Sequence, residues 1–289
     1  MTNIEHLPNE LLSMCLSYLD FYNIYEIFFH LNFRFNQLIR YATKLHLHLS
    51  SIPSGKFLQF CYQLNQYMKT TGNYPYTLIA EDKHKLKLIL EDEFFTESFS
   101  KLRTLILSNI DSHTLAFIIF DCPAKLYENL ENLALLENIT EDNRQSRYNL
   151  EWLCNNLISS KMKSLKYFKL NIEHYKSNSP FYLYFNTFTI ENISLSNLET
   201  LIIGYSGYPT STIVSFETLT QKLFPRLPKL KNLLIDFLEF ETWCMELPRV
   251  LPTTTDVSSN VPLSLQYVKI EVEGEETDRN DQSIEHKNS

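Results

Sequence analysis

Glycine is scarce in this chain, with five residues among 289. None are spaced as G-x-G-x-x-G or G-x-x-x-x-G-K, so the sequence offers no phosphate-cradling loop. Basic residues are not in excess either, because 34 acidic residues outnumber 26 lysines and arginines. The formal net charge of −8 argues against a general nucleic-acid binder. No apolar run approaches the roughly 20 residues that span a membrane.

Cysteine usage points to a reducing compartment. The cysteines are odd in number and never paired as C-x-x-C, which indicates free thiols. The N-terminus has no basic segment followed by the apolar run typical of a signal peptide. We therefore expect a cytoplasmic and/or nuclear protein with no membrane and no nucleic acid among its partners. The cysteines are Cys15, Cys61, Cys122, Cys154 and Cys244.

Catalytic and metal-binding patterns are missing as well. His46 and His48 lie two residues apart in an alternating segment, where they would face the same side of a strand. A metal site needs a third and usually a fourth ligand, and the sequence nearby offers none. We expect no catalytic residues, no metal and no cofactor, so the chain is not expected to be an enzyme.

What the sequence does contain begins with a small helical module in the first forty residues. Pro8 suits the first turn of a helix. Asn23, with Glu26 three residues later, is typical of an N-cap with a capping box, and Asn32 can cap a third short helix. The apolar positions exceed what about 40 residues can bury alone, so we expect a partner. They are Leu11, Leu12, Cys15, Leu16, Leu19, Ile24, Ile27, Phe28, Leu31, Phe35, Leu38 and Ile39.

The order of these residues resembles the F-box, which runs L-P-x-E-L-L, an apolar position and S-Y-L-D, then a polar-capped helix and R-F-x-x-L-I. The resemblance covers Ile4 to Tyr41. Cys15 stands where the family usually has a larger aliphatic residue, Leu16 replaces a common Phe, and Phe35 is present without a Trp. The resemblance implies docking on the Skp adaptor of a cullin-based SCF ubiquitin ligase. The implied docking residues are Leu7, Pro8, Leu11, Leu12, Leu16, Leu19 and Ile24.

A repeat follows the module. Six segments share the form apolar-x-x-apolar-x-apolar, and their starts are 28, 35, 33, 32 and 35 residues apart. This pattern resembles leucine-rich repeats, and the resemblance implies an α/β fold: a curved solenoid with a parallel sheet and outer helices. The Asn or Cys that usually follows the last strand Leu is missing except at Asn138, so the array is divergent. The segments start at Leu102, Leu130, Leu165, Leu198, Leu230 and Leu265.

Strand alternation predicts which face of the array meets a target. Leu105 and Leu107 would point into the core, and Ile106 and Ser108 outward. The outward columns have an apolar middle and a charged C-terminal end, a mixture that favours a protein target. The alternative, that a C-terminal helix or loop covers this face, stays open. The predicted target-binding residues are Ile106, Leu136, Lys169, Asn171, Ile202, Leu234 and Asp236.

These observations predict an F-box over residues 1–42, a leucine-rich-repeat-like domain over 43–273 and a disordered acidic tail over 274–289. In the second part we expect strands at Leu45–Leu49 and Leu86–Leu90 and a helix at Phe57–Met68. Helical periodicity also marks Thr114–Ile119, Tyr148–Ser159 and Ser211–Leu223.

Two functions remain open. The chain could be a substrate adaptor of an SCF ligase, with the Skp adaptor and cullin ligase core as partners and an unknown target protein on the repeats. Alternatively, it could be a non-catalytic repeat scaffold without any ubiquitin linkage.

Overall fold

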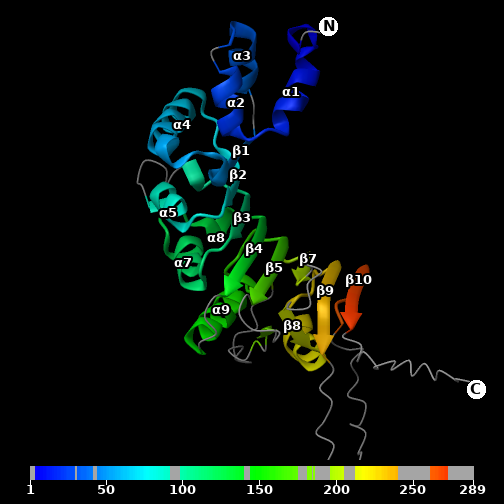
Figure 1. Cartoon of the computed structure of the whole chain (residues 1–289). Helices are drawn as coiled ribbons and strands as arrows, with labels where there is room; N and C mark the ends of the chain where they lie inside the picture. The colour runs from blue at the N-terminus through cyan, green and yellow to red at the C-terminus, as the bar shows by residue number, and fades with distance from the viewer. Residues whose placement is uncertain are drawn as a thin grey trace, which may run out of the picture.

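N-terminal helices precede an all-parallel sheet in this α/β protein (Figure 1). The computed structural model describes residues 4–29, 31–41, 44–91, 98–139, 144–174, 181–183, 185, 196–204, 212–239 and 261–272. The described strands are β1 (Leu45–His48), β2 (Pro75–Ala80), β3 (Thr104–Ser108), β4 (Asn132–Ile139), β5 (Tyr167–His174), β6 (Phe181–Leu183), β7 (Thr200–Ile203), β8 (Thr212–Ser215), β9 (Asn232–Glu239) and β10 (Tyr267–Val272). Their order is β1-β2-β3-β4-β5-β7-β9-β8-β6, and β10 pairs with β9.

The helices fall into two groups. The first three form the N-terminal module: α1 (Asn9–Ser17), α2 (Phe21–Phe28) and α3 (Phe33–Tyr41). The others follow one another along one side of the sheet: α4 (Phe57–Thr71), α5 (Lys83–Glu91), α7 (Ser112–Ala116), α8 (Leu126–Asn129) and α9 (Arg144–Leu157) (Figure 1). No helix among the described residues is long and apolar enough to cross a membrane.

Side chains fix the three helices of the module to one another. The Asn32 side chain accepts the Phe35 N–H at 3.0 Å, which confirms its predicted capping role. The prediction for Asn23 is wrong, because α2 begins at Phe21 and Asp20 caps it by accepting the Tyr22 N–H. Arg34 of α3 donates to the carbonyl oxygens of Glu5 and Leu7, and so holds the start of α1.

The module is joined to the sheet through its second and third helices. Asp20 accepts hydrogen bonds from the His48 N–H of β1 at 2.7 Å and from the Ser51 hydroxyl. Ile39 of α3 belongs to the same core as Leu45 and Leu47. Phe35 is buried elsewhere, between the helices, with its ring 5.2 Å from that of Phe28.

The six predicted repeat strands lie in one sheet in matching register. Thr104, Asn132, Tyr167, Thr200, Asn232 and Tyr267 succeed one another as paired positions from β3 to β10. In the first five repeats, all three apolar residues of the motif are at most 1% exposed. The strand positions and the inward direction of Leu105 and Leu107 are therefore confirmed.

A backbone pattern recurs at every step between these strands. The Arg103 carbonyl accepts the N–H groups of Glu131 and Asn132, the second and third residues of the next repeat. The carbonyls of Glu131, Lys166, Glu199 and Lys231 each accept two N–H groups from the following repeat in the same way. The repeat is thus a unit of structure as well as of sequence.

Two predicted segments differ from the structure. Leu86–Leu90 is helix α5, not a strand, because Leu86, Ile89 and Leu90 are buried at helical spacing and Asp82 accepts the His84 N–H at its start. The strand of this region is β2, which lies earlier. Ser211–Leu223 is helical only from Phe216, since Thr212–Ser215 forms β8. The tail predicted over 274–289 lies outside the described residues.

Four other predictions agree with the structure. Leu45–Leu49 contains β1, and Phe57–Met68 lies within α4. Thr114–Ile119 is helical across α7 and the short π-helix that follows, and Tyr148–Ser159 largely coincides with α9.

Candidate interaction surfaces

Helix α1 is apolar on two faces. Leu12 and Leu16 are buried, 1% and 6% exposed, against the rest of the module. On the other side, Leu11, Met14, Cys15 and Tyr18 follow the i, i+3, i+4, i+7 spacing of one helical face. All four are exposed: Leu11 to 46%, Met14 to 57% and Tyr18 to 85%. We call these four residues the α1 stripe. An apolar face left in water on a short helix is typical of a docking surface.

The predicted docking residues therefore divide into two sets. Leu12, Leu16 and Ile24 form part of the module's interior. Pro8, Leu11 and Leu19 are exposed and Leu7 is half-buried, so only these can meet a partner without rearrangement. The sequence did not single out Met14 and Tyr18, although both follow Leu11 at helical spacing.

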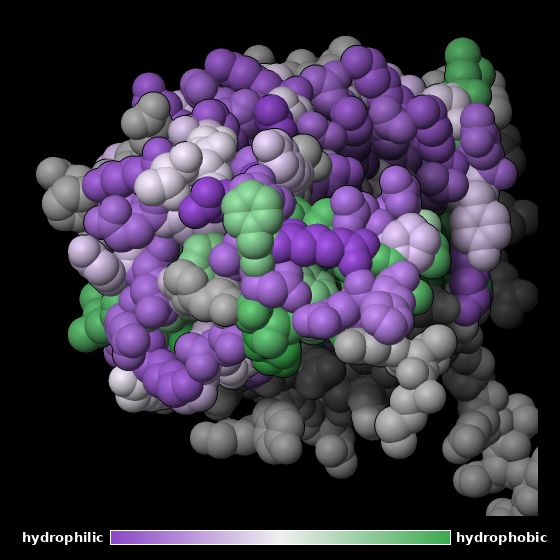
Figure 2. Space-filling model, turned by 90° about the horizontal axis from the view of Figure 1, so that it is seen from above, coloured by the Kyte–Doolittle hydropathy of each residue, from purple (hydrophilic) through white to green (hydrophobic). Residues whose placement is uncertain are grey.

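Further apolar side chains are exposed around the module. Viewed from above, onto the end where α1–α3 lie, hydrophobic side chains interrupt a mostly hydrophilic surface (Figure 2). Leu31 and Phe33 flank Asn32, whose amide donates to the Glu5 carboxylate beside α1. The apolar surface thus extends from α1 towards α3. The other exposed apolar residues of the module are Ile4, Ile27 and Tyr41.

A small pocket of about 220 Å³ lies where the module meets the sheet. Its apolar wall comes from Leu16, Phe21, Ile24, Leu38, Ile39 and Leu45, and its polar rim includes Ser13, Ser17, Lys44 and His46. Lys44 also lies over the Tyr76 ring, 5.0 Å from its centre. The pocket borders α1 on the side away from the α1 stripe.

On the outward face of the sheet, the predicted target-binding residues lie in two adjacent columns. One column of paired positions contains Ile106, Lys169, Ile202 and Leu234. The next column contains Leu136 and Asn171, which pair with each other. All are half-buried except Asn171, which is 6% exposed and whose Oδ1 accepts no hydrogen bond from the described residues. The side chain of Asp236 lies outside the described residues. Lys169 makes no ion pair with any described residue.

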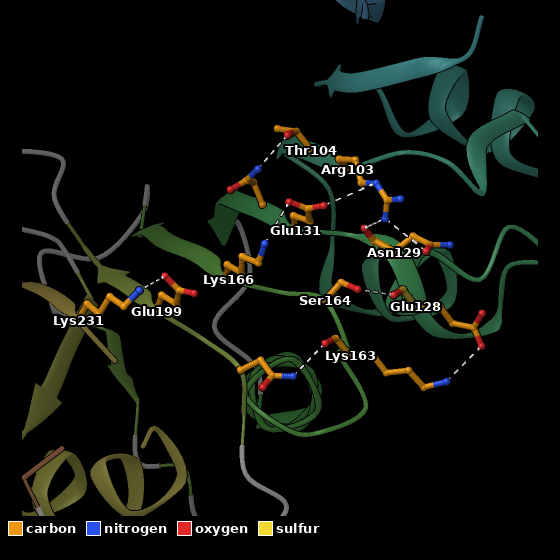
Figure 3. A network of polar contacts seen from close by, with 12 residues as sticks. Arg103, Thr104, Glu128, Asn129, Glu131, Lys163, Ser164, Lys166, Glu199 and Lys231 are labelled. Carbon is orange, nitrogen blue, oxygen red and sulfur yellow. Dashed lines mark hydrogen bonds and ion pairs between the residues drawn. The ribbon is translucent and has the colours of Figure 1, made fainter. Parts of the chain in front are cut away.

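A polar ladder runs along the edge where the strands begin (Figure 3). Asn129 donates to the Ser100 carbonyl, Ser164 to that of Glu128, and Asn197 to that of Lys163. Ser264 continues the series by donating to the Pro228 carbonyl. Each donor directly precedes the first Leu of its repeat, and each acceptor lies two residues before the first Leu of the preceding repeat.

Charges of alternating sign lie one residue beyond that first Leu. Glu131 has Arg103 at 3.7 Å on one side and Lys166 at 3.6 Å on the other (Figure 3). Lys231 donates to Glu199 at 2.7 Å, and this bond holds the pKa of the Glu199 carboxyl below its usual value. These side chains are 33% to 56% exposed, so the ion pairs are expected to contribute little to stability.

The two histidines do not form a metal centre with the described residues. No group of three or more His, Cys, Asp or Glu side chains among them could hold a metal ion. Burial lowers the pKa of His46. His48 lies 4.0 Å from Glu81 and donates its backbone N–H to Asp20.

Comparison with known proteins assigns no family. No protein-family model matches the chain, and no curated protein matches it either.

Proposed function

We propose that this chain is a substrate-recognition adaptor of a cullin-based SCF ubiquitin ligase. The observation that carries the proposal is the α1 stripe. A helix that buries Leu12 and Leu16 needs no second apolar face to fold, yet Leu11, Met14 and Tyr18 supply one. The stripe lies within the segment that resembles an F-box, whose helices dock on the Skp adaptor.

The repeats would form the second half of the adaptor. The matching register and the recurring two-donor pattern support a leucine-rich-repeat-like solenoid, curved around its row of helices. In this arrangement the outward row that contains Ile106, Lys169 and Ile202 would hold the target protein. The chain would have no chemistry of its own, and it would raise the rate of ubiquitin transfer by proximity. It would act in the cytosol or nucleus, where the ligase works.

Binding to a purified Skp adaptor tests this proposal. We expect the wild-type chain to retain the adaptor in a pull-down and a Leu11→Asp, Met14→Asp variant to lose it, because two carboxylates would have to be desolvated in the interface. Leu12 must be left intact, since a charge at this buried position would unfold the module.

A matched control comes from α4, where Leu58 and Tyr62 are exposed one helical turn apart. Leu58→Asp with Tyr62→Asp introduces the same charges on another helix and should leave adaptor binding intact. If the wild-type chain fails to bind any Skp adaptor, the alternative of a repeat scaffold without ubiquitin linkage takes the place of this proposal.

A further inference from the structure

The last described strand has an open outer edge. Strand β10 pairs with β9 on one side, and no other described strand pairs with it (Figure 1). Five repeat carbonyls, from Arg103 to Lys231, each accept two N–H groups from the next repeat. The equivalent carbonyl of Gln266 accepts none from the described residues. This edge therefore offers hydrogen-bonding groups to a further strand.

The core is open at the same end. Val268 occupies the motif position that is at most 1% exposed in the five preceding repeats, yet it is 46% exposed. Its neighbours Val261, Leu263 and Tyr267 are exposed as well. At the other end of the sheet, Asp20 accepts the His48 N–H and α2 packs on β1. A terminal repeat whose apolar side meets water needs a cap, and only the N-terminal end has one among the described residues.

The sequence of β10, Tyr-Val-Lys-Ile-Glu-Val, is complementary to itself when antiparallel. With Ile270 opposite its own copy, Val268 lies opposite Val272 and Lys269 lies opposite Glu271. Because side chains alternate along a strand, the three apolar pairs of such a dimer would share one face and the two opposite-charge pairs the other. A lone lysine on an edge strand would repel a second copy, whereas a Lys-x-Glu sequence attracts it.

The backbone direction fits this register. The Tyr267 N–H donates to Lys231 next to β9, so the N–H groups of alternate residues, Val268, Ile270 and Val272, point to the open side. The pairing of β10 with β9 contains a bulge: Ile270 pairs with Ile235 and Val272 pairs with Leu238, so β9 advances three residues while β10 advances two. The extra residue therefore lies in β9. Lys269 and Glu271 would then form the non-hydrogen-bonded pairs, whose side chains approach most closely.

We propose that two copies of this chain associate through β10 as an antiparallel, two-fold symmetric pair that joins their sheets and cores. The proposal is independent of adaptor binding, because α1 lies at the opposite end of the molecule (Figure 1). The expected dimer is concentration-dependent, since a six-residue strand and a few apolar side chains form a small interface.

Sedimentation of the full chain over a wide concentration range tests the proposal. We expect a monomer–dimer equilibrium for the wild type. Lys269→Glu or Glu271→Lys alone should each weaken association about tenfold or more, because two like-charge pairs then oppose each other in the dimer. An equimolar mixture of the two variants should associate again, because every pair regains opposite signs.

Lys169→Glu is the matched control, because Lys169 holds the same repeat position as Lys269 but lies in an inner strand. It should leave the association unchanged, and circular dichroism should show that all variants stay folded. A wild-type chain that remains monomeric at every concentration would overturn the proposal and leave other residues of the chain as the cover of this edge. Variants that dimerise as the wild type does would overturn it too.

Discussion

The carboxylate of Asp20 accepts the backbone N–H of His48 at 2.7 Å, and this bond joins the helical module to the first strand of the sheet. The same side chain caps α2 and accepts the Ser51 hydroxyl. One residue thus sets where the module stands relative to the repeats. Its replacement by Ala removes three hydrogen bonds, and we expect this to lower the free energy of unfolding by about 2 kcal/mol.

Asp20 should also make stability depend on pH. Burial raises the pKa of its carboxyl above the ordinary 3.8, more than its hydrogen bonds lower it. The folded state then binds the proton more tightly than the unfolded state, so stability falls as pH rises from 3.8 through the raised pKa. Asp20→Asn cannot ionise and should lack this contribution. Urea unfolding of both proteins at a series of pH values measures the difference, and equal slopes would contradict the expectation.

The uncharged hydrogen bonds of the polar ladder should contribute more to stability than the ion pairs beside it. Asn129→Ala should destabilise the chain by about 1 kcal/mol, because it removes the amide that donates to the Ser100 carbonyl. Lys231→Met should cost less, because its ion pair with Glu199 is exposed. Asn156→Ala is the control, since among the described residues its amide bonds within its own helix and to Lys161. Chemical denaturation measures the loss in the free energy of unfolding for each of the three variants. A larger loss for Lys231→Met than for Asn129→Ala would contradict this explanation.

The open end of the core should tolerate truncation better than its middle. Leu201→Ala is expected to cost roughly 3 kcal/mol, because Leu201 is fully buried between neighbouring strands. Val268→Ala, at the same repeat position, should cost less than about 1 kcal/mol in the monomer. Thermal unfolding at low protein concentration compares them. Equal losses would mean that Val268 is covered in solution.

The strands of the repeats could be predicted because the motif encodes them directly. Leu-x-x-Leu-x-Leu places two side chains on one face of a strand and one before it, and all three are buried together in five repeats. Strand β2 was not predicted because it carries no such motif. A strand was predicted within helix α5 instead, because Leu86-Lys87-Leu88 alternates between apolar and polar residues. The helical signals in the sequence were Asp82 as a cap and the i, i+3, i+4 spacing of Leu86, Ile89 and Leu90.

The interaction surface could be predicted only in part. The sequence marks Leu11 and Leu12 alike, but which of two adjacent leucines faces water depends on how α3 packs against α1. The polar ladder could not be predicted from the sequence for a similar reason. Asn129, Ser164 and Asn197 differ in type and share only their position, and their bonds link residues 29 to 36 positions apart.

Cys15 provides the most direct test of the central claim, that the α1 stripe binds a Skp adaptor. It is the exposed cysteine on the stripe, whereas Cys61, Cys122 and Cys154 are buried. The rate of Cys15 alkylation, followed by peptide mass spectrometry, should fall strongly when a saturating Skp adaptor is added. An unchanged rate in the presence of bound adaptor would contradict the claim, because docking would then leave the α1 stripe in water.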